Sequence, residues 1–243
     1  MRMCVRAAAG VLSALAASAP AGVVQAYQVD VYGTDNVFGA GRTSPPAPGG
    51  GGGGTLPQML QLPAVQSGAY FSLAAAFGEV SCCSGGFGSF NGPDGGSNAS
   101  GNTDVNSFGG ISGLTHSGKT MFLAGVFLSD EEPSGDPPPR LDFSEGGDNF
   151  EELSPLLNQT FFIGDGLFFH EDSLRHFDAQ KFYIPAGATR LALGFVDGFE
   201  FDGDPGFYND NTGFLTVVLG VVPTPGAASL LGAAGLVGLR RRR

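Results

Sequence analysis

The chain has 243 residues, among them 41 glycines, 16 prolines and 21 phenylalanines but no tryptophan. This length suits one sizeable domain with additional segments, and so much glycine and proline favours short strands and turns over helices. The formal charge is -11, although six of the twelve basic residues lie at the two chain ends. Such an acidic middle argues against a nucleic-acid partner and suits divalent cations or neutral ligands, unless the charge serves only solubility.

The first 26 residues have the layout of a secretory signal peptide. Arg2 and Arg6 precede an apolar run, and Val24-Gln25-Ala26 forms a small-x-small cleavage site. We therefore expect a signal-peptide helix over residues 1–26, cleavage after Ala26 and export of the mature chain.

Residues 27–55 read as a leader and linker. Prolines and a run of six glycines, residues 49–54, have high conformational entropy and little side-chain surface to bury. Within this segment the alternation of residues 28–32 suits a short strand that docks on the domain.

Residues 56–222 carry apolar runs of strand length that are separated by turn signals. The runs occupy residues 69–82, 120–128, 159–164, 181–185, 189–196 and 213–222. This pattern predicts an all-β fold, a single β-sandwich or jelly roll, flanked by the signal-peptide helix and a short C-terminal apolar helix.

Cys82 and Cys83 are the cysteines that remain after signal-peptide removal. Their Cα atoms, about 3.8 Å apart, are closer than in ordinary disulfides, so a bridge between them is strained. The alternative is two small buried side chains, and the spacing gives little support to metal or redox chemistry.

An acidic loop lies between the last two predicted strands. Its carboxylate and amide side chains are Asp197, Glu200, Asp202, Asp204, Asn209, Asp210 and Asn211. Carboxylates this dense repel one another unless a cation lies among them, and Ca²⁺ prefers such hard oxygen ligands in a glycine-rich loop. The alternative is a solvated acidic loop.

Asp197-Gly198 and the segment PGFYNDNTG at 205–213 resemble the last hairpin of the PA-IL-like calcium-dependent galactophilic lectins, a β-sandwich family. The resemblance implies Ca²⁺ ligands at Asp197, the Phe207 carbonyl, Asp210 and Asn211, with sugar hydroxyls completing the shell. The chain departs from the family by the inserted FEFDGD and by the acid at position 210, and it lacks the family's sugar-contacting histidine.

Aromatic side chains around this loop are candidates for stacking on a sugar ring. They are Phe199, Phe201 and Tyr208, together with Phe207. The alternative is that at least two of them belong to the core or hold the loop.

Other residues give only weak signals of a metal site or of catalysis. His170 and His176 in HEDSLRH have the side chains for a metal site but not HExxH spacing, so a solvated loop is the favoured alternative. No GxSxG motif occurs, and a chance pair among 23 acids proves nothing about glycosidase chemistry. We expect a protein that is not an enzyme.

The C-terminal segment, residues 223–243, combines Pro223-Thr224-Pro225, an apolar stretch and four terminal arginines. The stretch would form a helix of about 22 Å, shorter than the hydrocarbon core of about 30 Å. The arginines would stay on the cytoplasmic side, which makes the segment a short or transient membrane anchor. The arginines are Arg240, Arg241, Arg242 and Arg243.

This ending resembles the PEP-CTERM sorting signal of bacterial exported proteins, with Thr224 where that family usually has glutamate. The resemblance implies recognition by a membrane exosortase, cleavage near the Pro-x-Pro segment and a setting of exopolysaccharide and biofilm.

The sequence thus predicts an exported cell-surface or matrix protein that binds extracellular polysaccharide through Ca²⁺. The expected partners are the export machinery, exosortase, the membrane and a polysaccharide. The alternative is a structural or adhesive biofilm protein without a sugar site, in which calcium only stabilises a loop; a carbohydrate-active enzyme is the third class.

Overall fold

The computed structural model describes residues 25–64, 67–83, 89–97, 101–144, 147–170 and 176–223. Within these residues the chain forms fifteen β-strands and three short 3₁₀ helices, which confirms the all-β prediction. The 3₁₀ helices are η1 (Val37–Gly39), η2 (Phe199–Phe201) and η3 (Tyr208–Asp210). The predicted C-terminal helix lies outside the described residues, and so does the signal-peptide helix except for residues 25 and 26, which belong to a strand.

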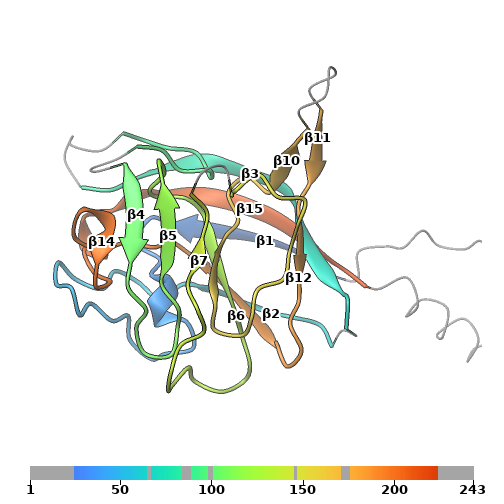
Figure 1. The fold of residues 1–243 in the computed structure, drawn as a ribbon, viewed down its shortest axis with the longest axis horizontal. Coiled ribbons are helices and arrows are strands. Elements are labelled where there is room, and N and C mark those ends of the chain that lie inside the picture. The colour runs from blue at the N-terminus through green and yellow to red at the C-terminus, as the bar shows by residue number, and fades with distance from the viewer. Residues whose placement is uncertain are drawn as a thin grey trace, which may run out of the picture.

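The strands are arranged in three sheets and one separate hairpin (Figure 1). The five-stranded sheet has the order β1 (Gln25–Tyr32), β15 (Thr212–Val222), β3 (Tyr70–Ser81), β12 (Lys181–Tyr183) and β8 (Glu152–Leu153). A four-stranded sheet has the order β2 (Gln58–Gln61), β13 (Arg190–Gly194), β6 (Ala124–Leu128) and β9 (Thr160–Phe162). A second four-stranded sheet has the order β14 (Asp202–Gly203), β4 (Asn102–Val105), β5 (Leu114–Ser117) and β7 (Leu141–Asp142). The hairpin consists of β10 (Leu167–Phe169) and β11 (Phe177–Ala179).

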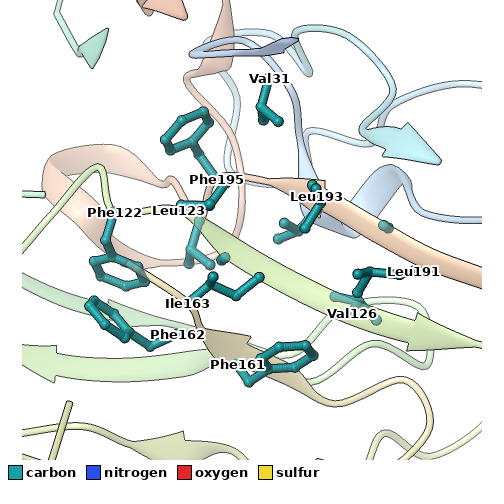
Figure 2. Packing of buried hydrophobic residues seen from close by; sticks show 14 of the residues in the cluster. Val31, Phe122, Leu123, Val126, Phe161, Phe162, Ile163, Leu191, Leu193 and Phe195 are labelled. Atoms are coloured by element: carbon teal, nitrogen blue, oxygen red, sulfur yellow. The ribbon is translucent and has the colours of Figure 1, made fainter. Parts of the chain in front are cut away.

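Phenylalanine rings join the five-stranded sheet to the sheet that contains β6. Phe71 of β3 stacks on Phe182 of its own sheet at 4.7 Å between ring centroids, and it meets Phe127 of β6 at 5.8 Å. Phe161 of β9 lies 5.7 Å from Phe182. The two sheets therefore pack face to face in a sandwich-like arrangement, and Figure 2 shows the buried side chains of the β6, β9 and β13 sheet.

β15 is the second strand of the five-stranded sheet, and its alternation explains which of its faces meets the core. Leu215, Val217, Leu219 and Val221 are buried, whereas Phe214 is exposed. Side chains of a strand alternate between its two faces, so this pattern directs one face of β15 to the core. The strand pairs with β1 on one side and β3 on the other.

The interpretation of residues 27–55 as a linker is corrected by the structure. β1 pairs with β15 along its whole length, from Gln25↔Val221 to Tyr32↔Phe214, so a strand does dock here as the alternation predicts. Beyond it, buried Asp35 accepts hydrogen bonds from the Tyr32 amide, Thr55 and Gln58. This segment belongs to the folded domain, because its strand pairs with β15 and its buried Asp35 is held by hydrogen bonds.

The glycine run is also ordered by contacts rather than acting as a spacer. Gly50 O accepts from the Phe207 amide at 2.9 Å, and Gly54 N donates to Asn209 Oδ1 at 2.9 Å. Gly54 has φ +68°, and a Cβ there would lie 2.2 Å from the Thr34 carbonyl oxygen. Glycine is needed because the backbone must approach the 205–209 loop closely.

The ends of the chain are described only in part. Ala26 lies in β1, so cleavage after it would leave residues 27–32 paired with β15. Pro223 directly follows β15, whereas Thr224, Pro225 and the terminal arginines lie outside the described residues. In the part of the chain that the structure describes, no helix is both long and apolar enough to cross a membrane.

Candidate ligand pocket around Asp197

The acidic loop begins where β13 ends and is closed at its base. Phe195 and Val196 are buried after β13, Asp197 follows, and an isolated bridge joins Gly198 to Pro205. The stretch between them, which contains the insertion FEFDGD, forms η2 and β14, and β14 pairs in parallel with β4. The insertion is therefore held against a neighbouring sheet.

Tyr208 fixes the backbone on which Asp197 stands. Its ring is fully buried, and its hydroxyl donates to Phe195 O and accepts from Asp197 N, both at 3.0 Å. Burial raises the pKa of this hydroxyl well above its ordinary value, so it stays protonated. The prediction that Tyr208 stacks on a sugar is wrong, because the ring belongs to the interior.

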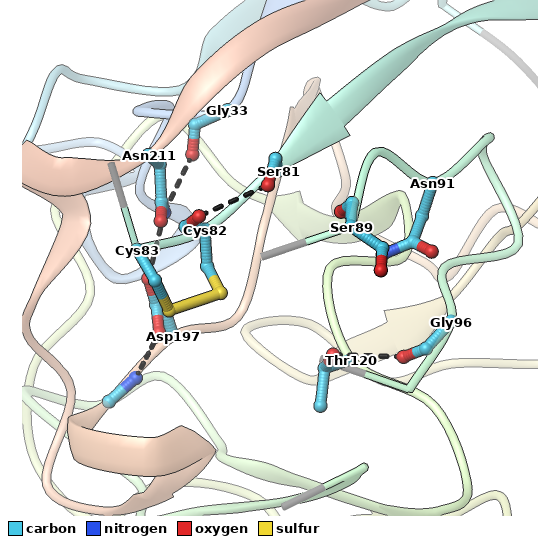
Figure 3. The surroundings of a disulfide bond; sticks show 11 residues. Gly33, Ser81, Cys82, Cys83, Ser89, Asn91, Gly96, Thr120, Asp197 and Asn211 are labelled. Carbon is cyan, nitrogen blue, oxygen red and sulfur yellow. Dashed lines mark hydrogen bonds between the residues drawn. A yellow bond between two sulfur atoms is a disulfide. The ribbon is translucent and has the colours of Figure 1, made fainter. Parts of the chain in front are cut away.

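Asp197 is 2% exposed and is bonded within the loop (Figure 3). Its Oδ1 accepts from the Gly198 amide at 2.8 Å, and its Oδ2 accepts from Asn211 Nδ2 at 2.7 Å. Asn211 Nδ2 also donates to Gly33 O at 3.0 Å, which fixes the orientation of the amide. The structure thus joins two predicted ligands, Asp197 and Asn211, directly.

Asn211 carries the unusual atom of this site. The residue is 7% exposed, and its buried Oδ1 has no hydrogen-bond partner within the described residues. Buried polar atoms without a partner are rare in native proteins and call for an explanation. Asn211 Nδ2 already donates to two acceptors. A 180° rotation of the amide would place Oδ1 against those acceptors and break both hydrogen bonds, so it would not remove the problem.

Within the described part of the chain, no ion pair joins Asp197 or Asp210 to a basic side chain. Burial is the main cause that raises the pKa of Asp197 to about 8; the hydrogen bonds from Asn211 and the Gly198 amide oppose this rise, and the negative charge of Asp210 adds to it. Burial also raises the pKa of Asp210. Ionisation of both groups is therefore unfavourable unless a cation binds.

A pocket of about 210 Å³ opens beside these carboxylates. Its lining residues are Cys82, Cys83, Asp197, Gly198, Phe199, Glu200, Phe201, Phe207 and Asp210. Among the residues that the structure describes, none of those that line it is basic. The pocket therefore combines three carboxyl groups with aromatic and sulfur surface.

The adjacent cysteines form a disulfide, which settles the alternative that the sequence left open. The bridge follows the end of β3 and lies at the pocket wall (Figure 3). Cys83 has φ 62°, a conformation that side chains other than glycine rarely adopt. The bridge presents two bonded sulfur atoms in place of thiols, so this part of the wall offers no S–H donor.

The two phenylalanines of the FEF segment differ sharply. Phe199 is 60% exposed and its ring lies 5.2 Å from that of Phe207, so these two rings can meet a ligand. Phe201 is 2% exposed and belongs to the hydrophobic core, although it also lines the pocket. The prediction of a stacking role for Phe201 is thus corrected by its burial.

The donor set fits a hard cation. Each Asp197 oxygen accepts one hydrogen bond and retains a lone pair, Asp210 lines the same pocket, and Asn211 Oδ1 lacks a partner among the described residues. Oxygen ligands of this kind suit Ca²⁺. Of the four predicted ligand residues, Phe207 also lines the pocket, whereas Asn211 is not among the lining residues and reaches the site through its bond to Asp197.

Sequence reasoning missed two parts of this site. The glycine run supports the loop that carries Phe207 through the bond from the Phe207 amide to Gly50 O. The disulfide lines the pocket together with Asp197. The signal in the sequence was the clustering of glycine, which occurs where backbones approach closely as well as in linkers. Comparison of the chain with models of protein families, with curated proteins and with solved structures finds no match.

Proposed function

We propose that the protein is an exported cell-surface or matrix protein that binds extracellular polysaccharide in the Asp197 pocket with the help of Ca²⁺. Its role is binding rather than catalysis. The observation that carries the proposal is a buried carboxylate, Asp197, that shares its pocket with Asp210 and contacts an amide whose oxygen has no partner among the described residues.

Calcium would supply positive charge to the buried Asp197 and Asp210 carboxyl groups and a partner to Asn211 Oδ1. Asp197, Asp210 and the Asn211 Oδ1 would supply oxygen ligands, and the Phe207 carbonyl is the further ligand that the lectin resemblance implies. When bound, the ion supplies positive charge that keeps both carboxylates ionised and offers open coordination positions to sugar hydroxyls.

The rest of the pocket suits a neutral sugar. Phe199 and Phe207 offer aromatic surface to the C–H face of a ring, and the disulfide adds an apolar wall. The Glu200 carboxylate adds an acceptor for hydroxyl groups. The acidic surface of the domain argues against polyanionic ligands.

Export and sorting rest on the sequence alone. The signal-peptide layout ending at Ala26 and the PEP-CTERM-like segment from Pro223 to Arg243 support passage through the export machinery and recognition by exosortase. The apolar stretch would hold the chain at the membrane until it is cut. The sandwich-like fold is also the architecture in which the lectin resemblance places its sugar site.

The test of calcium binding is calorimetric titration of the full chain with Ca²⁺ after treatment with EDTA. Asp210→Asn removes a carboxylate from the pocket, and Asp202→Asn removes the same charge from exposed β14 in the same loop. We expect the first variant to weaken Ca²⁺ binding and the second to leave it unchanged. Equal affinities for the two variants would remove the proposed site.

The test of sugar binding uses the same protein with neutral oligosaccharides, in Ca²⁺ and in EDTA. Phe199→Ala should weaken binding, whereas Phe77→Ala, which removes an equally exposed ring (58%) from β3, should not. Turnover of a saccharide would instead support the enzyme class.

The second candidate is a structural or adhesive surface protein. It is favoured by the use of both Asp197 oxygens inside the loop, which would let calcium act only as a loop stabiliser. A melting temperature that rises with Ca²⁺ while no saccharide binds would support this candidate over the first.

A further inference from the structure

The hairpin β10–β11 has two chemically different faces. Its register pairs Phe168 with Asp178 and Phe169 with Phe177, and the His170 amide donates to His176 O at 3.1 Å. Directly opposed residues of an antiparallel pair share a face, and the faces alternate along each strand. His170, His176 and Asp178 therefore fall on one face, together with Phe168.

The side chains on this face converge. His170 Nε2 hydrogen-bonds to Asp178 Oδ2 at 2.9 Å, and the His170 and His176 rings stack at 4.1 Å between centroids. One ligand atom from each of the three residues lies within 4.8 Å of the others. His170 is half-buried, whereas His176 and Asp178 are exposed, so two of the three side chains can adjust.

We propose that His170, His176 and Asp178 form a binding site for a divalent transition metal of the Zn²⁺ class. Two imidazoles and a carboxylate are ligands that zinc accepts, with a fourth position for water. Zinc–ligand bonds of about 2.0–2.1 Å place tetrahedral ligand atoms roughly 3.3 Å apart. His170 Nε2 and Asp178 Oδ2, at 2.9 Å, would have to move slightly apart, and no pair of ligand atoms would have to close by more than about 1.5 Å. The exposed His176 and Asp178 side chains can make such adjustments.

Metal binding replaces one existing contact. The ion takes the place of the proton that His170 Nε2 shares with Asp178 Oδ2, and the neutral ring then carries its proton on Nδ1. Phe168 lies 4.5 Å from the His170 ring in an edge-on arrangement and limits the side from which the ion approaches. Imidazole ligands select zinc-like ions over Ca²⁺, so this site is chemically distinct from the Asp197 pocket.

The position of the site indicates what the metal would do. The opposite face of the hairpin carries Leu167, Phe169 and Phe177, which line a pocket of about 330 Å³. Asn149 anchors the strand end there, since it donates to Phe169 O at 3.1 Å and accepts from Phe169 N at 2.8 Å. A two-stranded hairpin is only marginally stable by itself, so a metal that ties β10 to β11 stiffens this pocket wall.

The test is a Zn²⁺ titration of the full chain, followed by competition with a chromogenic chelator and by NMR of the imidazole signals. The chain has 3 histidines, and His116 is 3% exposed in the interior, so it serves as an internal control. We expect one equivalent of Zn²⁺ to shift the signals of His170 and His176 and to leave those of His116 in place. A shift of only one surface imidazole would overturn the proposal.

Variants separate this site from adventitious binding. His176→Gln and Asp178→Asn should each weaken Zn²⁺ binding by at least about tenfold, whereas Asp136→Asn, an exposed acid in another loop, should not. Millimolar Ca²⁺ should not displace the zinc. Displacement by Ca²⁺, or unchanged affinity in both site variants at unchanged melting temperature, would refute the assignment.

Discussion

Asp197→Asn should change the way in which the stability of the calcium-free protein depends on pH. Burial raises the pKa of Asp197 from 3.8 to about 8. The folded protein therefore holds this proton more tightly than the unfolded chain does. The stability that the protonated group contributes is complete below pH 3.8 and is lost as the pH rises to about 8.

The magnitude follows from the size of this shift. One pKa unit corresponds to about 1.4 kcal/mol, so a rise from 3.8 to about 8 corresponds to ~6 kcal/mol of unfolding free energy. Other acids act in the opposite sense: Lys119 helps to lower the pKa of Asp148, which contributes stability that is lost as pH falls. The quantity to measure is therefore the difference between Asp197→Asn and the unchanged protein.

The assay is denaturant unfolding of both proteins in EDTA at several pH values from about 4.5 to about 9. The free energy of unfolding of the variant should rise relative to that of the unchanged protein as pH rises, by ~5 kcal/mol between about pH 4.5 and about pH 9, because part of the ~6 kcal/mol falls below about pH 4.5. Asparagine also places an amide against Asn211 Nδ2, which adds an offset that does not depend on pH. Only the slope tests the reasoning.

Calcium provides the second arm of this experiment. A bound cation stabilises the ionised carboxylate, so saturating Ca²⁺ should flatten or reverse the slope that EDTA reveals. A difference that stays constant with pH in EDTA would show that Asp197 does not titrate in this range. A slope that is the same with and without Ca²⁺ would show that Asp197 is not a calcium ligand.

Three further predictions concern the parts that surround this pocket. Gly54→Ala should lower stability by about 1–3 kcal/mol, because a Cβ would lie 2.2 Å from Thr34 O; Gly92→Ala, with open space around it, is the control in the same thermal melts. Reduction of Cys82–Cys83 should change the melting temperature little, because a disulfide between adjacent residues hardly restricts the unfolded chain. It should nevertheless weaken saccharide binding measured by calorimetry. In a host with an exosortase, mass spectrometry should find the released chain ending near Pro223, and a double Pro223→Ala, Pro225→Ala variant should stay with the membrane fraction; equal release of both would contradict the sorting proposal.

The apolar runs predicted the strands well where alternation was strong. The run at 213–222 became β15, and its alternation placed Leu215 and Val217 in the core. The alternation at 28–32 predicted a docked strand, but pattern carries no information on distant partners, so it did not show that this strand pairs with β15 at the edge of the sheet. The prediction of a linker at the glycine run failed for the same reason, since its partners in the acidic loop, such as Asn209, lie more than 150 residues away in the chain.

The FEF segment shows why the stacking residues were only partly predictable. Phe199 and Phe201 are two residues apart, so an extended chain would place both rings on one face. Glu200 and Phe201 instead adopt left-handed conformations, with φ 53° and 61°. The turn exposes Phe199 and buries Phe201, a distinction that depends on how the loop docks through β14 on β4.

The pocket joins chain segments that meet only after the whole domain has folded. The glycine run, the disulfide after β3 and the 197–211 loop come together because β1, β15 and β3 are neighbours in one sheet. A ligand that binds only this assembled state must stabilise the fold, by ~2.7 kcal/mol at a hundred times its Kd. The last pair of β15 is Val222↔Tyr70, directly before Pro223. A cut at Pro223 to Pro225 would therefore release the domain with every strand pair of β15 intact, so sorting and ligand binding do not compete for the same residues.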